Sequence, residues 1–177
     1  MSTICITGHQ GTGKSTILNE LRKLGYRAYG LDEEKLAGYH NLITNKPSTN
    51  IPVGLDRNLV WRKDNVWKLD ISKVRNLGVL EDANPTFFIG YATNIEELWN
   101  ICNEIVILEL NDDTTINRLQ NRSNNSFGKH PGELELAIDN SKIIHEKATV
   151  HKNHNVHFID GSMSVQDIIF KILELSR

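Results

Sequence analysis

Short apolar runs alternate with stretches of helical periodicity along most of the chain. The runs favour β-strands because they are brief, rich in β-branched or aromatic residues, and bounded by turn-forming residues. Helices or long crossovers separate them, and strands joined in this way pair in parallel. The pattern therefore predicts an α/β fold with a parallel sheet of about five strands. The expected strands are Ile4–Thr7, Tyr26–Leu31, Pro85–Gly90, Ile105–Leu110 and Val156–Ile159.

Amphipathic spacing and cap residues indicate where the helices lie. Ile17–Leu24 repeats apolar residues at helical spacing and is followed by Gly25, which is typical of a helix end. Asn111-Asp112-Asp113 is expected to cap the helix that carries Arg118 and Arg122. Further helical segments are expected to end at Ser72–Gly78, to start at Asn94–Trp99, and to cover Glu133–Val150 and Val165–Leu175.

A long polar segment, Gly38–Ser72, interrupts the alternation after the second strand. It is too long for a simple connection, and its two tryptophans with interleaved cations argue against disorder. We expect an insert that covers a substrate, with Arg57, Trp61 and Trp67 as candidate contacts. The alternative is that both tryptophans only anchor a small satellite core.

A nine-residue stretch supplies the most specific chemistry. It fills the pattern Gly, four residues, Gly, Lys, Ser or Thr, and it lies between a predicted strand and a predicted helix, which is the context this motif requires. Its backbone amides and the following helix start suit nucleotide phosphates. Lys14 is expected to reach the β- and γ-phosphates of ATP, and the Ser15 hydroxyl to ligate Mg²⁺. The expected nucleotide-binding residues are Gly8, His9, Gln10, Gly11, Thr12, Gly13, Lys14, Ser15 and Thr16. The alternative is a Gly-rich turn with an exposed lysine.

Asp32 follows the second predicted strand. Ligands of open α/β sheets bind beyond the carboxyl ends of the strands, where both the phosphate loop and Asp32 are expected. Asp32 is therefore a candidate for contact with an acceptor. The acidic sequence Asp32-Glu33-Glu34 also favours a helix start, with Asp32 as the N-cap, and the two interpretations are compatible.

Arg118 and Arg122 are four residues apart, so they are expected to share one helix face. A polyphosphate between two such arginines would turn their repulsion into binding. The Asn- and Gly-rich residues that follow, Ser123–Gly132, favour a loop that can close. We expect residues 118–132 to form a lid.

The charge balance limits the partners. With 20 Lys and Arg against 22 Asp and Glu in 177 residues, no strong field favours nucleic acid or anionic lipid. Two distant cysteines, Cys5 and Cys102, indicate reduced core thiols. The chain opens almost directly with a predicted strand and has no apolar run long enough to span a bilayer, so we expect one cytoplasmic domain, as a monomer or homodimer, without nucleic-acid or membrane partners.

Two further patterns bear on the chemistry. Pro85–Gly90 is followed by no carboxylate of the kind that motor-type ATPases use, which counts against a mechanochemical role. His151, His154 and His157 recur every third residue, as zinc ligands can. His157 is nevertheless expected on a strand and His151 at a helix end, and no fourth ligand is apparent, so we do not favour a zinc site.

With the phosphate loop, the arginine pair and the turn Ile159-Asp160-Gly161, the chain resembles the small P-loop kinases, the group of adenylate, nucleotide and shikimate kinases. The resemblance implies a three-layer P-loop NTPase fold with helices on both faces of the sheet. It also implies that Arg118 and Arg122 contact the ATP phosphates from the base of a lid, and that the backbone near Gly161 lies against the adenine. Shikimate- and gluconate-type members carry Asp-x-Asp after the second strand, where one carboxylate serves Mg²⁺ through water and the other meets the acceptor hydroxyl. Here the matching residues are Gly30-Leu31-Asp32, so only the second carboxylate is kept.

The sequence thus predicts an ATP- and Mg²⁺-dependent phosphotransferase acting on a nucleotide, nucleoside or hydroxylated metabolite, with Lys14, Asp32, Arg118 and Arg122 as catalytic candidates. A nucleotide-binding regulator or slow ATPase would use the same loop. The insert and the lid favour the transferase, because a transferase must exclude water.

Overall fold

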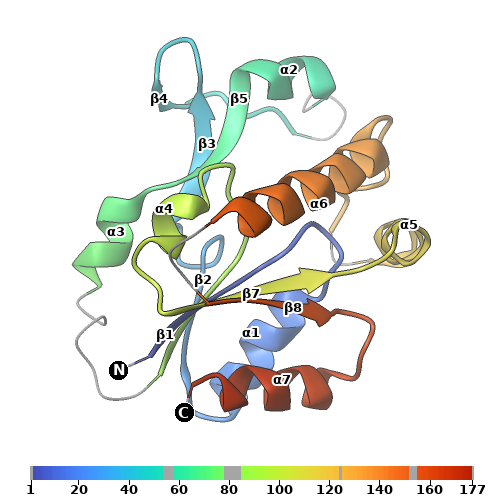
Figure 1. Ribbon diagram of the computed structural model, residues 1–177. Coiled ribbons are helices and arrows are strands. Elements are labelled where there is room, and N and C mark those ends of the chain that lie inside the picture. The colour runs from blue at the N-terminus through green and yellow to red at the C-terminus, as the bar shows by residue number, and fades with distance from the viewer. Residues whose placement is uncertain (1, 54–57, 78–84, 124, 152–154, 177) are drawn as a thin grey trace.

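A five-stranded parallel sheet forms the centre of the computed structural model, which describes residues 2–53, 58–77, 85–123, 125–151 and 155–176 (Figure 1). The strand order is β2-β6-β1-β7-β8. All four pairings in this order are parallel, which confirms the predicted sheet. The strands are β1 (Thr3–Thr7), β2 (Arg27–Gly30), β6 (Thr86–Ile89), β7 (Glu104–Glu109) and β8 (Asn155–Asp160).

The central strands are buried along their whole length. Every residue of β1 and β6 is buried, and Ile4 of β1 stands beside Phe87 of β6. A strand that is covered on both faces needs apolar side chains on both, so it reads as an unbroken apolar run rather than an alternating one. This explains why these two strands are so apparent in the sequence.

Helices cover both faces of the sheet and give three layers (Figure 1). On one face, α1 (Lys14–Lys23) and α7 (Val165–Glu174) bury Ile17, Leu21 and Ile172 against the strands. On the other face, α3 (Ile71–Asn76), α4 (Glu96–Trp99) and α6 (Glu133–Val150) contribute to a second core that contains Trp99 and Ile144. α5 (Asp112–Asn121) follows β7 beyond its carboxyl end. Asn111 caps it by accepting a hydrogen bond from the Thr114 amide, as predicted.

The segment after β2 forms a second sheet that the sequence pattern did not reveal. β3 (Ala37–Asn41), β4 (Lys46–Pro47) and β5 (Asn65–Leu69) pair antiparallel in the order β4-β3-β5, and α2 (Leu59–Asp64) precedes β5. The strand β3, with sequence AGYHN, has no apolar alternation of its own. Its pairing partner supplies the missing apolar surface, because Tyr39 stands opposite Trp67. This small sheet lies above the carboxyl end of the main sheet (Figure 1).

Two local predictions are wrong. Residues 31–35 form a turn that leads into β3, so Asp32 caps no helix. α5 ends at Asn121, and Arg122 is its C-cap with an extended ψ of 145°. The two arginines therefore do not project from consecutive turns of one helix, although both remain at its end.

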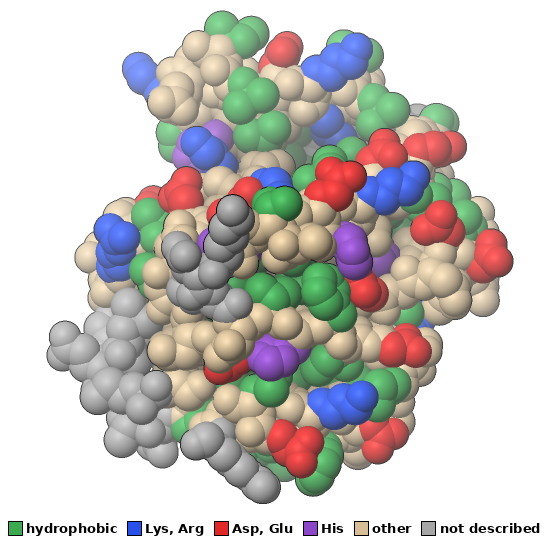
Figure 2. All heavy atoms as spheres, viewed as in Figure 1, with side chains coloured by type: hydrophobic (Ala, Val, Ile, Leu, Met, Phe, Trp, Pro, Cys, Tyr) green, Lys and Arg blue, Asp and Glu red, His purple; other side chains and the backbone are tan. Residues whose placement is uncertain are grey.

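The surface is of mixed charge. On the face shown in Figure 2, acidic and basic side chains are interspersed, in keeping with a formal net charge of -2. Among the described helices, none combines the length and the apolar character needed to cross a membrane.

Candidate active site

The loop between β1 and α1 has a backbone that only glycine accommodates at its two ends. Gly8 has φ 150°, and a Cβ at this position would collide with the Leu108 carbonyl oxygen. Gly13 has φ 97° and begins α1 from the left-handed region. The loop therefore passes close to the end of β7 and delivers the unpaired amides of the first turn of α1 toward the cleft.

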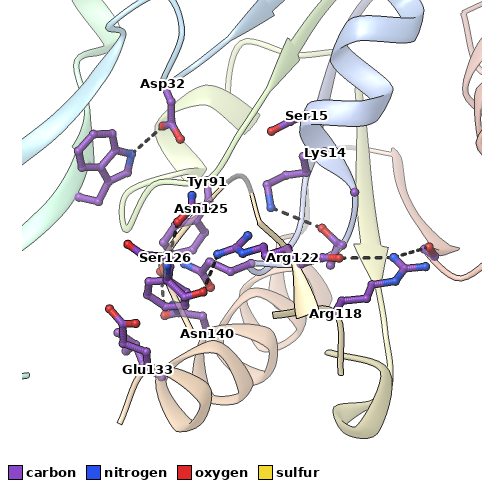
Figure 3. A pocket seen from close by; sticks show the side chains of 18 of the residues that line it. Lys14, Ser15, Asp32, Tyr91, Arg118, Arg122, Asn125, Ser126, Glu133 and Asn140 are labelled. Atoms are coloured by element: carbon purple, nitrogen blue, oxygen red, sulfur yellow. Dashed lines mark hydrogen bonds between the residues drawn. The ribbon is translucent and has the colours of Figure 1, made fainter. Parts of the chain in front are cut away.

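Lys14 folds back over this loop. Its Nζ donates hydrogen bonds to the Gly8 and His9 carbonyl oxygens, each at 2.7 Å. Burial lowers the pKa of Lys14 to about 8, with a raising contribution from Asp32 and a lowering one from Arg122. The ammonium group thus lies between an acidic and a basic neighbour, and the exposed Ser15 side chain follows it on the first turn of α1 (Figure 3).

The side chains of His9 and Gln10 tie the loop to the two helices that flank the predicted lid. His9 Nε2 lies 2.8 Å from Thr115 Oγ1 on α5, and both residues are buried. Gln10 Oε1 accepts a hydrogen bond of 3.2 Å from Asn140 Nδ2 on α6. Asn140 in turn accepts a bond from the Tyr91 hydroxyl, and burial, followed by Glu96, raises the pKa of Tyr91 to about 12. The nucleotide loop is therefore connected to the carboxyl end of β6.

The buried His9 gives a test of this environment. Burial, and then the charge of Lys14, lower the pKa of His9 to about 4 from 6.5. The unfolded chain thus binds more protons than the folded one between these values, so stability falls as pH falls from about 6.5 toward 4, by up to about 3 kcal/mol. We expect His9→Gln to lose this part of the pH dependence in urea unfolding at pH 7.5, 6 and 5. An unchanged slope would show that His9 does not titrate in this way.

Arg118 is held against the two backbone segments that the sequence assigned to nucleotide binding. Its Nη1 donates to the Gly161 carbonyl at 3.0 Å and to the Gly11 carbonyl at 3.4 Å. The structure therefore brings α5, the phosphate loop and the turn after β8 together at one point, on the far side of the loop from Asp32 (Figure 3).

Arg122 faces the inside of the cleft with part of its guanidinium uncommitted. Nη2 donates to the Phe127 carbonyl at 2.9 Å, whereas the buried Nε has no hydrogen-bond partner among the described residues. Burial lowers the pKa of Arg122, and Glu133 opposes this effect. Arg122 nevertheless lines the cleft, so its guanidinium supplies positive charge where an anionic group such as a phosphoryl oxygen could bind.

The segment after Arg122 is anchored by one buried carboxylate. Glu133, 5 % exposed, accepts hydrogen bonds from the Gly128 amide at 2.8 Å and the His130 amide at 3.3 Å. Its other oxygen pairs with Arg62 of α2 at 3.3 Å. The predicted lid is thus in contact with the segment after β2 in this structure, and the two enclose the cleft together.

Asp32 lies across the cleft from Ser15 and Lys14 (Figure 3). Its Oδ1 accepts a hydrogen bond of 3.0 Å from the Trp67 indole nitrogen. Partial burial and the neighbouring Glu33 raise its pKa, although Trp67 and Lys14 oppose this. At position 30, a Cβ would press on the Glu33 carboxylate and the Leu18 side chain, so a larger residue there would displace these two side chains.

The three residues that were predicted to contact a substrate from the insert have different positions in the structure. Trp67 lines the cleft, whereas Trp61 packs edge-to-face on Tyr39 at 4.7 Å and is not among the lining residues. Tyr39 makes the same kind of contact with Trp67 at 4.8 Å. Arg57 lies outside the described residues. The structure therefore places Trp67 at the cleft and Trp61 beside Tyr39 outside its lining, and a substrate contact by Trp67 stays a prediction.

Several lining residues were missed. Tyr91 lies two residues after the end of β6, so the rule that sites lie at carboxyl strand ends could have indicated it. Asn140 interrupts the apolar stripe of α6, and a polar residue in such a stripe is a usable signal. The pairing of Arg62 with Glu133 joins residues 71 positions apart and has no local signature.

One cleft of about 970 Å³ contains most of these groups. Its lining joins the phosphate loop and the first turn of α1 with Asp32, Arg118, Arg122, Trp67 and Gly161. A cleft of this size is large enough for a nucleotide together with a second small molecule.

The structure describes two of the three histidines of the His151, His154 and His157 pattern, and both cysteines. His157 Nε2 lies 2.6 Å from Glu104, His151 packs on Trp99, and His154 is outside the described range. No metal-binding group of three or more His, Cys, Asp or Glu occurs in the described part of the chain. Cys5 and Cys102 are both buried free thiols, as predicted.

The phosphate loop, the strand order and the helices on both faces define a P-loop nucleotide-binding fold. Residues 4–141 match the family model of an AAA domain, and the chain belongs to this family. A search of curated proteins finds no significant match.

Solved structures with similar folds are small P-loop kinases, and their identities are low enough to show the fold alone. A shikimate kinase from Acinetobacter baumannii in complex with shikimate is 19% identical, with TM-score 0.59 over 99% of this chain and 92% of that one. A deoxyadenosine kinase from M. mycoides is 13% identical, with TM-score 0.54 over 98% and 97%. A gluconokinase from Sinorhizobium meliloti is 12% identical, with TM-score 0.55 over 99% and 93%.

Proposed function

We propose that this chain transfers the γ-phosphoryl group of ATP to a hydroxyl group of a small acceptor. The observation that carries the proposal is the position of the Asp32 carboxylate, which faces Lys14 and Ser15 across one cleft. A protein that only binds or hydrolyses a nucleotide has no need of a carboxylate and an aromatic wall at this place.

Each residue of the site has a role that follows from its position in the cleft. The loop amides and Lys14 bind the β- and γ-phosphates, and Arg118 holds the loop against the turn at Gly161 beside the adenine site. Arg122, which lines the cleft, supplies its guanidinium charge to the transferring group. Asp32 accepts the proton of the acceptor hydroxyl as the oxygen bonds to the γ-phosphorus and the bond to the β-phosphate oxygen breaks, which leaves ADP and the phosphorylated acceptor.

The donor set fits Mg²⁺. Ser15 presents an exposed hydroxyl at the start of α1, where it would hold the ion together with the nucleotide phosphates, and Asp32 across the cleft is left for the acceptor. A Mg²⁺ ion held there would neutralise charge on the β- and γ-phosphates.

The acceptor belongs to the nucleosides, nucleotides or hydroxylated metabolites. Similar folds serve proteins that are named for deoxyadenosine, shikimate and gluconate, all of which carry hydroxyl groups. Trp67 and Tyr39 supply apolar surface on the acceptor side, and Asp32 supplies the polar contact. We propose a cytoplasmic monomer or homodimer that needs neither nucleic acid nor a membrane.

The direct test is ADP release from purified protein with ATP and Mg²⁺, measured against nucleosides, nucleotides, shikimate-like acids, sugars and sugar acids. The proposal expects at least one acceptor to raise the rate well above the rate without acceptor, with a phosphorylated product visible by mass spectrometry. If ATP binds but no acceptor in these classes changes the rate, the chain is a nucleotide-binding regulator or slow ATPase.

Replacing Arg122 and replacing Arg118 should have different effects on turnover and on ATP affinity. We expect Arg122→Ala to lower kcat by about 100-fold or more and to change ATP affinity little, because its guanidinium charge acts most strongly when charge spreads over the transferring group. Arg118→Ala should mainly weaken ATP binding, since Arg118 holds the loop to the turn at Gly161. Kinetics and calorimetry separate the two effects.

The exposed Arg75 on α3 is the matched control, and Arg75→Ala should change neither quantity. A loss of folding stability in Arg122→Ala, without a selective loss of kcat, would assign Arg122 a structural role instead.

A further inference from the structure

The bond between His9 and Thr115 joins two residues that are 106 positions apart and almost fully buried, at 2% and 1% exposure. His9 stands in the phosphate loop, yet its ring is directed to the side of α5. A buried imidazole and a buried hydroxyl that satisfy each other at 2.8 Å form a specific point of contact, because either group alone would lose its partner.

The inner face of α5 rests on the phosphate loop at three successive points. Thr115 meets His9, and the Arg118 guanidinium donates to the Gly11 carbonyl. Leu119 lies 3.3 Å from the place that a Cβ of Gly11 would take, so the loop passes directly under this side chain. These positions are three and four residues apart and therefore share one face of the helix.

The arginines depend on the placement of this face. Arg118 is one turn beyond Thr115, and Arg122 follows at the C-cap. α5 rises 1.5 Å per residue, so even a slip by a fraction of a turn would move both guanidinium groups by more than an ångström. A displacement of about 1 Å at a reacting centre can cost about 100-fold in rate.

We propose that His9, through Thr115, is a positioning residue that fixes α5 on the phosphate loop and so places the Arg122 guanidinium group for phosphoryl transfer. Arg118 is held in addition by its own bonds to the Gly11 and Gly161 carbonyl oxygens. His9 itself touches neither the transferring group nor the acceptor in this scheme. The inference rests on the proposed function for its kinetic part, whereas the contact between α5 and the loop can be tested in the protein without ligand.

The contact involves a neutral imidazole. Protonation would place a second positive charge beside Lys14, whose Nζ is bonded to the His9 carbonyl. The Thr115 hydroxyl can donate to an unprotonated Nε2 or accept from a protonated one, so the bond is compatible with either neutral tautomer.

The sharpest variant is Thr115→Val, which removes the hydroxyl and keeps the branched shape. We expect kcat to fall by about 10- to 100-fold while the ATP dissociation constant stays within about threefold. Thr115→Ser restores the hydroxyl and should recover most of the rate. Thr114→Val, the same change one residue earlier on the half-buried side of α5, is the matched control and should behave like the parent.

A double-mutant cycle then tests the route through the arginine. If Thr115 acts by placing Arg122, the loss in Thr115→Val/Arg122→Ala should equal the loss in Arg122→Ala alone. Losses that multiply would overturn the proposal, and so would a Thr115→Val enzyme with the parent kcat.

Hydrogen exchange of the ligand-free protein separates this inference from the proposed function. We expect the amides of residues 116–122 to exchange faster in Thr115→Val than in Thr114→Val. Equal exchange in the two variants would overturn the positioning role even if the parent proves to be a kinase. Faster exchange in Thr115→Val, together with a parent protein that phosphorylates no acceptor, would support the contact between α5 and the loop and reject the kinase function.

Discussion

Lys14→Ala is expected to reduce ATP-dependent turnover by about three orders of magnitude, because it removes the charge that bridges the leaving and transferring phosphoryl groups. ATP affinity should also fall, since the same ammonium group binds both phosphates. ADP release and calorimetry measure the two losses. Lys23→Ala on the exposed end of α1 is the matched control and should leave both unchanged.

Stability should not follow activity in this variant. Burial lowers the pKa of Lys14 to about 8 from 10.5, so between these values the folded protein binds fewer protons than the unfolded chain. The buried charge therefore costs stability at neutral pH, and this cost diminishes as pH rises from about 8 to 10.5. We expect Lys14→Ala to unfold at no lower urea concentration than the parent. A variant that turned over like the parent would remove the phosphate-binding role of this loop.

The parts of the fold that are visible in the sequence are those whose burial is decided locally. β1 and β6 are covered on both faces and so read as continuous apolar runs, and α6 runs over the predicted Glu133–Val150. Asn111 and Ser164 cap α5 and α7 with their own side chains, so these helix starts depend only on neighbouring residues.

The second sheet depends on pairing at a distance, which local patterns do not encode. Tyr39 is polar-flanked in the sequence and becomes part of an aromatic group only when β3 stands beside β5. The same holds for Glu133, whose neighbours in sequence give no hint of Arg62. The turn at Asp32 is a third case, because its acidic residues favour a helix start whereas the chain turns toward β3.

The residues of the proposed site also fall into those that local sequence indicates and those that depend on contacts between distant segments. The phosphate loop follows from a motif, because its glycines and Lys14 act through the backbone that they themselves form. Tyr91 and Asn140 belong to the cleft only because the middle of α6 lies beside the segment that follows β6, as their hydrogen bond shows. His9 occupies one of the four unspecified positions of the motif. Its contact with Thr115 depends on α5 lying beside the loop, which the local sequence does not indicate.

Asp32→Asn is the second large effect that we expect. Asparagine keeps the shape of the side chain and can still accept the hydrogen bond from Trp67, which is 3.0 Å long in the parent, but it cannot take a proton. Acceptor phosphorylation should fall by about two to four orders of magnitude with ATP affinity nearly unchanged. Calorimetry with ATP, alongside ADP release with and without the best acceptor, measures both.

The pH dependence of the parent gives the same residue a second test. Partial burial and Glu33 raise the pKa of Asp32, so the basic form is lost at a higher pH than for an ordinary aspartate, and turnover should decline as the pH falls through that raised value. The raised pKa also means that the charged carboxylate costs folding stability at neutral pH, so Asp32→Asn should be at least as stable as the parent. Trp67→Phe is the probe, because it removes the indole N–H and keeps a smaller aromatic ring: the carboxylate then loses a donor that favours its charged form, and the decline in turnover should shift to still higher pH. A profile that stays fixed in Trp67→Phe, together with an Asp32→Asn enzyme that phosphorylates normally, would leave Asp32 as a turn residue and return the chain to the nucleotide-binding alternative.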